Sequence, residues 1–245
     1  MMTLTRGFPA VVLLCLTFIR PAIAQLPSAP EKKTSVDFNL KGTLELVIKE
    51  QREGVALIED VRDLIRDTSI QARLRERYAK VAGFTLDFEA GVIVEYKGFH
   101  DPVVIVPIKG LRSVLYLVQV RGGSGDWHDL VFELERGDSS IGTVYIGDFE
   151  QLVTTRDERK TRSMKVSVDQ KGQVKDAQLL NPGTKGFTCF FNTAKQYFDV
   201  GKAGALGVSL VACLFVAPTA VAAFAPCGAS VAQMVGYLYA ARSCF

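Results

Sequence analysis

Apolar residues recur with a helical period in the part of the chain that follows residue 40. Between Leu44 and Val81 they form two successive stripes, and charged residues occupy the remaining faces. Thr68 and Ser69 interrupt the pattern, and either residue can cap a second helix. The first stripe consists of Leu44, Ile48, Val55, Ile58, Val61 and Ile65. This pattern predicts an N-terminal helical hairpin.

Beyond Gly83 the apolar positions alternate with a period of two, which is typical of β-strands. Asp169 to Gly172 separates the last two strand-like segments and has a glycine where a left-handed turn residue is favoured, which predicts a β-hairpin. The strand-like segments are residues 92–96, 103–108, 114–120, 130–134, 143–146, 164–168 and 174–180. We therefore expect an α+β fold with about five to seven mostly antiparallel strands.

A different pattern begins after the break at residues 181–186, which contains a proline and two glycines. The next residues predict an amphipathic helix, with an apolar stripe formed by Phe187, Phe190, Phe191, Ala194 and Phe198. No charged residue lies between Lys202 and Arg242, but Pro218 divides this stretch into pieces shorter than the ~20 residues of a membrane span. Gly, Ala and Ser are frequent there and let helices approach closely. The pattern predicts a small all-helical module over residues 187–245.

The N-terminus has the features of a secretory signal peptide. Arg6 precedes an apolar run from Phe8 to Ile19, and a small-residue sequence ends at Ala24. We expect cleavage between Ala24 and Gln25, which makes the protein secreted or extracytoplasmic. The late position of Arg20 leaves an uncleaved membrane anchor as the alternative.

Four cysteines remain after removal of the signal peptide: Cys189, Cys213, Cys227 and Cys244. An even number of cysteines in an exported chain predicts disulfides, here two that staple the small C-terminal module. Four cysteines allow three pairings, and the sequence does not select one. Because the cysteines lack the spacing and the histidines of a zinc site, no metal site is predicted.

Charge and composition exclude several functions. The net charge of +3, from 29 basic and 26 acidic residues, is too small to predict a nucleic-acid partner. Two His-Asp pairs, His100-Asp101 and His128-Asp129, lie in stretches that resemble turns, so we interpret them as solvated or capping groups. The chain has no known nucleophile, metalloprotease or phosphate-loop motif. We expect no enzymatic activity and no cofactor.

The tail is weakly cationic, since residues 186–245 carry Lys195, Lys202 and Arg242 against Asp199. A cationic, apolar and disulfide-bonded helical peptide is typical of molecules that act on anionic membranes. A basic run that ends at Arg162 is either a solvated connector or a site of proteolysis. The candidate processing sites are therefore Arg162 and the bond between Lys185 and Gly186.

The order of segments resembles the precursors of the halocin-type microhalocins and their bacterial relatives. The resemblance lies in the four tail cysteines and in the small-residue run from Gly201 to Gly236, behind a signal peptide and a helix-plus-sheet region. It implies that the tail is released as a bacteriocin and that the pro-region serves as its immunity partner. The layout of this chain is then a signal peptide (1–24), a linker (25–41), an α+β pro-region domain (42–180), a second linker (181–186) and the helical module (187–245).

Two functional hypotheses follow from this layout. In the first, the chain is a secreted precursor of an antimicrobial peptide, and the pro-region shields the tail or confers immunity. Its partners are a processing protease, the target-cell membrane and the pro-region itself, which contacts the tail. In the second, the protein is exported and stays uncleaved as a surface binding protein, whose C-terminal helices anchor it to a membrane or dock on the sheet.

Overall fold

The computed structural model describes residues 40–50, 57–78, 84–110, 114–135, 141–171, 173–181, 186–199, 213–214 and 220–244. The predicted signal peptide with its cleavage site at Ala24 and Gln25 lies outside these residues, as does Lys185.

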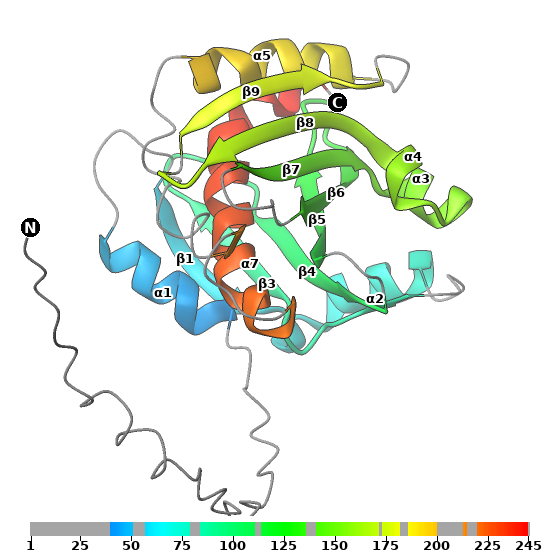
Figure 1. Cartoon of the computed structure of the whole chain (residues 1–245). Coiled ribbons are helices and arrows are strands. Elements are labelled where there is room, and N and C mark those ends of the chain that lie inside the picture. Colours follow the sequence, from blue (N-terminus) through cyan, green and yellow to red (C-terminus); the bar gives the residue numbers. More distant parts are fainter. Residues whose placement is uncertain are drawn as a thin grey trace, which may run out of the picture. The chain divides into compact units, whose positions relative to one another are not determined.

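A nine-stranded antiparallel sheet forms the centre of the described structure (Figure 1). Its hydrogen-bonded order is β1-β3-β4-β5-β6-β7-β8-β9, and β2 pairs with β4 beside this path. The strands are β1 Ile58–Asp63, β2 Thr85–Leu86, β3 Val92–Tyr96, β4 Val103–Lys109, β5 Val114–Arg121, β6 Trp127–Glu135, β7 Ile141–Asp148, β8 Arg162–Asp169 and β9 Val174–Leu179. The predicted α+β class with a mostly antiparallel sheet is confirmed, with two more strands than the largest number expected.

The predicted hairpin between the last two strands is also confirmed. β8 and β9 pair antiparallel, and the amide of Asp169 donates to the carbonyl of Gln173 across 3.0 Å. The Asp169 carboxylate accepts hydrogen bonds from the amides of Lys171 and Gln173 at 2.8 and 3.0 Å. This side chain thus closes the turn by binding its own backbone.

The predicted N-terminal helical hairpin is wrong. Helix α1 covers only Leu40–Glu50, and Ile58–Asp63 forms strand β1, which precedes the short 3-10 helix η1 (Leu64–Arg66). Ile58 and Val61 are both buried, although they are three residues apart, because the register of β1 shifts between Ile58 and Asp60. Such a bulge breaks the alternation of a strand and produces a spacing that imitates a helix.

Helix α2 does form after this strand, at Thr68–Tyr78. Its N-terminus is capped by Asp67 and not by Thr68 or Ser69, the residues expected from the sequence. The Asp67 carboxylate accepts hydrogen bonds from the amide of Ile70 at 3.0 Å and from the hydroxyl of Ser69 at 2.7 Å. Since an aspartate is a strong N-cap, the helix begins one residue earlier than the hydroxyl residues indicated.

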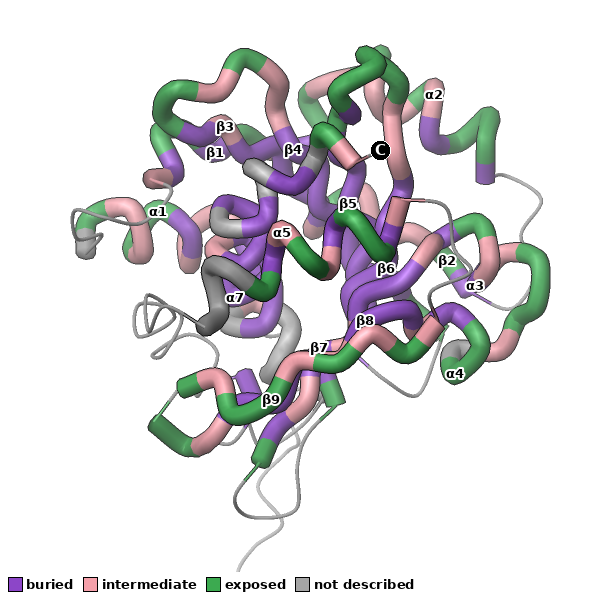
Figure 2. The backbone as a smooth tube through the Cα atoms, turned by 90° about the horizontal axis from the view of Figure 1, so that it is seen from above, coloured by how far each residue is buried: buried purple, intermediate pink, exposed green. Residues whose placement is uncertain are grey.

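Both faces of the sheet are buried. On one face, α2 and α3 (Phe149–Thr155) form a core cluster with the sheet, to which Val104, Val106, Leu115, Leu117 and Val131 contribute. The alternate residues of the same strands belong to a larger cluster on the other face, with α1, α5 (Phe187–Asp199) and α7 (Ala220–Leu238). Figure 2 shows β4 and β5 buried along most of their length, whereas the edge strand β9 is partly exposed.

The helices of the tail therefore do not stand apart from the sheet. α7 contacts β4 and β5 and also packs against α1 and α5. In Figure 1 it crosses one face of the sheet, with β1 on one side and β7 and β8 on the other. The 3-10 helix η4 (Tyr239–Cys244) continues from α7, and the short helix α4 (Glu158–Thr161) precedes β8.

Candidate functional site

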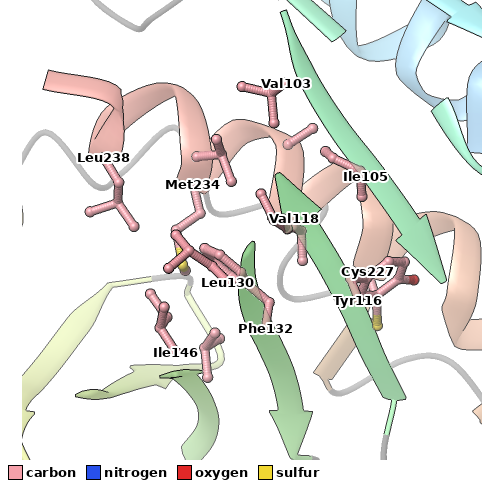
Figure 3. Close-up of a cluster of buried hydrophobic side chains, with 14 of the residues drawn as sticks. Val103, Ile105, Tyr116, Val118, Leu130, Phe132, Ile146, Cys227, Met234 and Leu238 are labelled. Carbon is pink, nitrogen blue, oxygen red and sulfur yellow. The ribbon is translucent and has the colours of Figure 1, made fainter. Parts of the chain in front are cut away.

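The sheet face that carries α7 is built from residues of the sheet and of the tail. We call it the helix-binding face and define it by the strand residues that share a buried cluster with α7 and are labelled in Figure 3: Val103, Ile105, Tyr116, Val118, Leu130, Phe132 and Ile146. From α7, the side chains of Cys227, Met234 and Leu238 point toward this layer. All of these residues are at most 4% exposed, so the contact excludes water on both sides.

Small residues let the tail approach closely. A Cβ atom at Gly228 of α7 would lie 2.4 Å from Cδ1 of Leu40 in α1 and 3.2 Å from Cε1 of Tyr116 in β5. A Cβ atom at Gly142 of β7 would lie 2.5 Å from Cδ1 of Leu214. Because real Cβ atoms essentially never lie within 3.0 Å of such atoms, a side chain at either position would force Leu40 or Leu214 to shift.

Two tyrosine hydroxyls add polar contacts to this apolar interface. The hydroxyl of Tyr96 donates to the carbonyl oxygen of Ala232 across 2.6 Å, and the Tyr116 hydroxyl forms a hydrogen bond with the backbone of Gly228. Complete burial raises the pKa of Tyr116 well above its usual value, so this hydroxyl stays protonated. Both hydroxyls contact the backbone of α7. The alternation of apolar residues along the strands does not predict such contacts.

The four tail cysteines form two disulfides, Cys189–Cys244 and Cys213–Cys227. The first joins α5 to η4, and the second joins the segment before α7 to α7 itself. The structure thus selects one of the three possible pairings. Both bridges connect residues within 187–245, so neither ties the tail to the pro-region.

The two candidate processing sites differ in their surroundings. Arg162 is the first residue of β8, which pairs with β7 on one side and with β9 on the other. Its guanidinium makes a double hydrogen bond to the buried Glu133 carboxylate, at 2.7 and 2.8 Å, and stacks 3.7 Å above the ring centre of Tyr145. Gly186 lies directly before α5 in a left-handed conformation with φ of 83°.

The two His-Asp pairs also differ from each other. His100 is exposed in a bend, as the sequence suggested, and Asp101 pairs with Arg121 across 3.0 Å. His128 and Asp129 instead lie within β6, so the expectation of a second turn is wrong. The strand begins earlier than its apolar residues indicate because the register with β5 continues through both residues to Trp127.

Asp129 is the centre of a buried polar cluster that sequence reasoning missed. Its carboxylate accepts hydrogen bonds from the hydroxyl of Tyr78 and from Nε2 of Gln119 at 2.6 Å, and it pairs with Nε of Arg77 at 3.1 Å. Burial raises the pKa of Asp129 to about 6, against the opposing effect of the Arg77 charge. Arg73 binds Gln119 at 3.0 Å and covers the ring of Trp127.

This cluster lies on the face opposite α7, because Asp129 alternates with Leu130 along β6 and two of its partners come from α2. Its contacts join α2 to β5 and β6 and thereby hold α2 on the sheet. The alternation of β6 could have placed Asp129 on that face, but the partners from α2 and β5 could not be read from the sequence.

Within the described residues, no three His, Cys, Asp or Glu side chains gather as metal ligands would. None of the helices in the described part of the chain combines the length and the apolar character needed to cross a membrane. Comparison of the chain with protein-family models, with curated proteins and with solved structures finds no match.

Proposed function

We propose that the chain is the secreted precursor of a membrane-active antimicrobial peptide, in which the pro-region holds and shields an apolar helical tail. The observation that carries this proposal is the placement of α7. The helix has no charged residue, and most of its described side chains between Cys227 and Leu238 are buried against the rest of the fold. An apolar peptide covered in this way is kept from water and from the producer's own membranes until it is released.

The disulfides support the same proposal. Since both bridges lie within residues 187–245, a single cut before α5 removes the covalent connection to the pro-region and leaves a peptide that keeps both staples. Bridges from the tail to the pro-region would have prevented such a release. In a small domain each disulfide contributes about 2–4 kcal/mol, which would help the freed tail keep its helical structure.

Of the two processing sites, we favour the bond between Lys185 and Gly186. Arg162 is a poor substrate for a protease, because it is engaged by Glu133 and belongs to a strand paired on both sides. A cut at Arg162 would also leave β8 and β9 attached to the tail. The freed peptide would then carry Lys195 and Arg242, which suit anionic lipid surfaces.

The alternative function is an exported, uncleaved surface binding protein whose tail docks on its own sheet. The close contact of Gly228 with Leu40, and the bond from Tyr96 to Ala232, favour this reading because they make α7 part of the core. The two functions differ in one respect that can be measured: the alternative requires the tail to remain covalently attached.

Intact-mass spectrometry of the culture supernatant and the cells, with and without reductant, separates the two functions. The precursor proposal expects a secreted peptide that begins at Gly186 and gains two hydrogens for each of two disulfides on reduction. Lys185→Gln should prevent its appearance, while Lys171→Gln serves as a matched control in the β8–β9 turn. Finding only a chain that ends at Phe245 and still includes the pro-region would contradict the precursor proposal.

Killing of sensitive cells is the second part of the test. The oxidised 186–245 peptide should kill them, and the Cys213→Ser/Cys227→Ser peptide should not. Equal killing by both peptides would refute the role of the staple, and no killing by either would refute the antimicrobial function.

A further inference from the structure

We infer that a cut in residues 182–185 does not by itself free the tail: α7 stays on the helix-binding face as a separate chain, and a lipid bilayer withdraws it. The inference rests on the proposed function only for the existence of the cut and of a lipid target. Release of the tail then takes two steps: the cut, and the transfer of α7 from the sheet into a lipid bilayer.

Both disulfides, Cys189–Cys244 and Cys213–Cys227, close loops inside the tail, so after the cut no covalent bond connects it to β1–β9. Whatever keeps the two chains together must then be non-covalent contact with the sheet and with α1.

That contact buries many side chains of α7. Ala229, Val231, Ala232, Met234 and Val235 of α7 are each at most 2% exposed, in one cluster with the sheet and with Leu40 and Leu44 of α1. Dissociation into water would expose this layer and the sheet beneath it together, a cost that grows with the apolar area. A cut in residues 182–185 leaves these apolar contacts, and therefore that cost, unchanged.

The geometry of the contacts at Gly228 and Ala232 fixes the helix in one register. Tyr96 binds the carbonyl of Ala232, and Gly228 fits against Leu40 and Tyr116. The two contacts lie about one helical turn apart and involve the backbone of α7, so a shifted helix would lose both. A rotated or sliding helix is therefore no easy route of escape.

The composition of α7 identifies the partner that competes with the sheet for this helix. Residues 220–238 contain no charged side chain, and Gly and Ala are frequent among them. Water stabilises such a helix poorly, whereas the apolar region of a bilayer accepts it, and small residues let helices repack within lipid. The basic residues Lys195 and Arg242 favour a bilayer that carries negative charge.

The experiment uses the full-length oxidised protein with a site-specific protease sequence placed in residues 182–185. After cutting, size-exclusion chromatography in detergent-free buffer should give one peak that contains both chains. Vesicles of equal parts phosphatidylglycerol and phosphatidylcholine should then carry the tail alone to the top of a flotation gradient. Separate elution of the tail without vesicles overturns the inference, and so does retention of the tail by the sheet at saturating vesicle concentrations.

Two variants test whether the named contacts are responsible. Tyr96→Phe removes one hydrogen bond and should lower the vesicle concentration for half-transfer by about five-fold. Gly228→Ala should lower it further if that chain folds. Tyr145→Phe is the matched control, because Tyr145 stacks with Arg162 and alternates with the core residues Val144 and Ile146. Identical transfer by the Tyr96→Phe, Tyr145→Phe and unaltered chains contradicts the assigned contacts.

The outcome is independent of the antimicrobial function. If the cut complex behaves as described but the peptide leaves sensitive cells unharmed, the proposed function fails and this inference stands. If the peptide kills cells but separates from the sheet in water, the proposed function stands and this inference fails.

Discussion

The hydroxyl of Tyr96 in β3 lies 2.6 Å from the carbonyl oxygen of Ala232 in α7, across 136 positions of sequence. Both residues are buried, and the bond connects the pro-region directly to the backbone of the tail. A helix that merely filled an apolar space would need no such contact. Removing this bond therefore measures how much the contact between the sheet and α7 contributes to the stability of the fold.

Replacement of Tyr96 by phenylalanine is expected to lower the free energy of unfolding by about 1 kcal/mol, because the ring stays in place and one buried hydrogen bond is lost. Urea denaturation followed by circular dichroism measures the change. Tyr145→Phe should have a smaller effect, since that ring is only half-buried. A Tyr96→Phe protein as stable as the parent would show that the bond contributes nothing.

The close packing at Gly228 predicts a larger effect. Gly228→Ala should destabilise the protein by about 2 kcal/mol, because the new methyl group overlaps Cδ1 of Leu40. In a Leu40→Ala background the same change should cost clearly less, since the overlapping atoms are gone. A double-mutant cycle by urea denaturation measures this coupling. Additive effects would mean that the two residues do not interact.

Asp129 predicts a dependence of stability on pH. Its pKa is raised from 3.8 to about 6 in the folded state, so between these values the folded chain binds a proton that the unfolded chain does not. The contribution of this group to stability is therefore fully present below pH ~4 and is lost as pH rises through ~6, a change of about 3 kcal/mol. Arg77, Arg73, Glu150 and Asp148 are the charged groups around it.

Asp129→Asn should flatten that part of the stability profile, whatever it does to stability overall. Urea unfolding at several values between pH 4 and pH 7.5 provides the comparison. Asp176→Asn is a suitable control, since Asp176 is exposed on the edge strand β9. An Asp129→Asn protein with the parental slope would assign the pH dependence to other groups.

The two disulfides should differ in their contribution and in their accessibility. The loops span 55 and 14 residues, so chain entropy predicts losses of about 4 kcal/mol for the Cys189→Ala/Cys244→Ala protein and about 3 kcal/mol for the Cys213→Ala/Cys227→Ala protein.

Because Cys189 is exposed whereas Cys213 and Cys227 are at most 5% exposed, a thiol reductant should open Cys189–Cys244 first. Mass spectrometry after partial reduction and alkylation would show the opposite order if this reasoning fails.

Much of the sheet could be predicted from alternation alone. β3 to β9 each contain a segment identified in the sequence, because residues such as Val94 and Ile93 face separate cores. β1 was missed because its bulge spaces Ile58 and Val61 like helix residues, and β2 has only two residues. The register shift depends on pairing with β3, which a local pattern does not encode.

The candidate site was less accessible to sequence reasoning. The tail was recognised as apolar, helical and rich in cysteine, but neither its partner nor its cysteine pairing could be derived. Tyr96 and Tyr116 looked like ordinary strand residues, since only their distant contacts with Ala232 and Gly228 give them a role. Such contacts join residues far apart in the chain and follow from the packing of the whole fold.

The position of α7 in the chain has a consequence for how the protein is made. Every strand of the sheet is synthesised before Ala220–Leu238, so the helix-binding face has no cover from α7 while the chain emerges. A nascent or prematurely terminated chain exposes this face and would be a substrate for chaperones and quality-control proteases. The helix-binding face is therefore covered by α7 only after the tail has been translated.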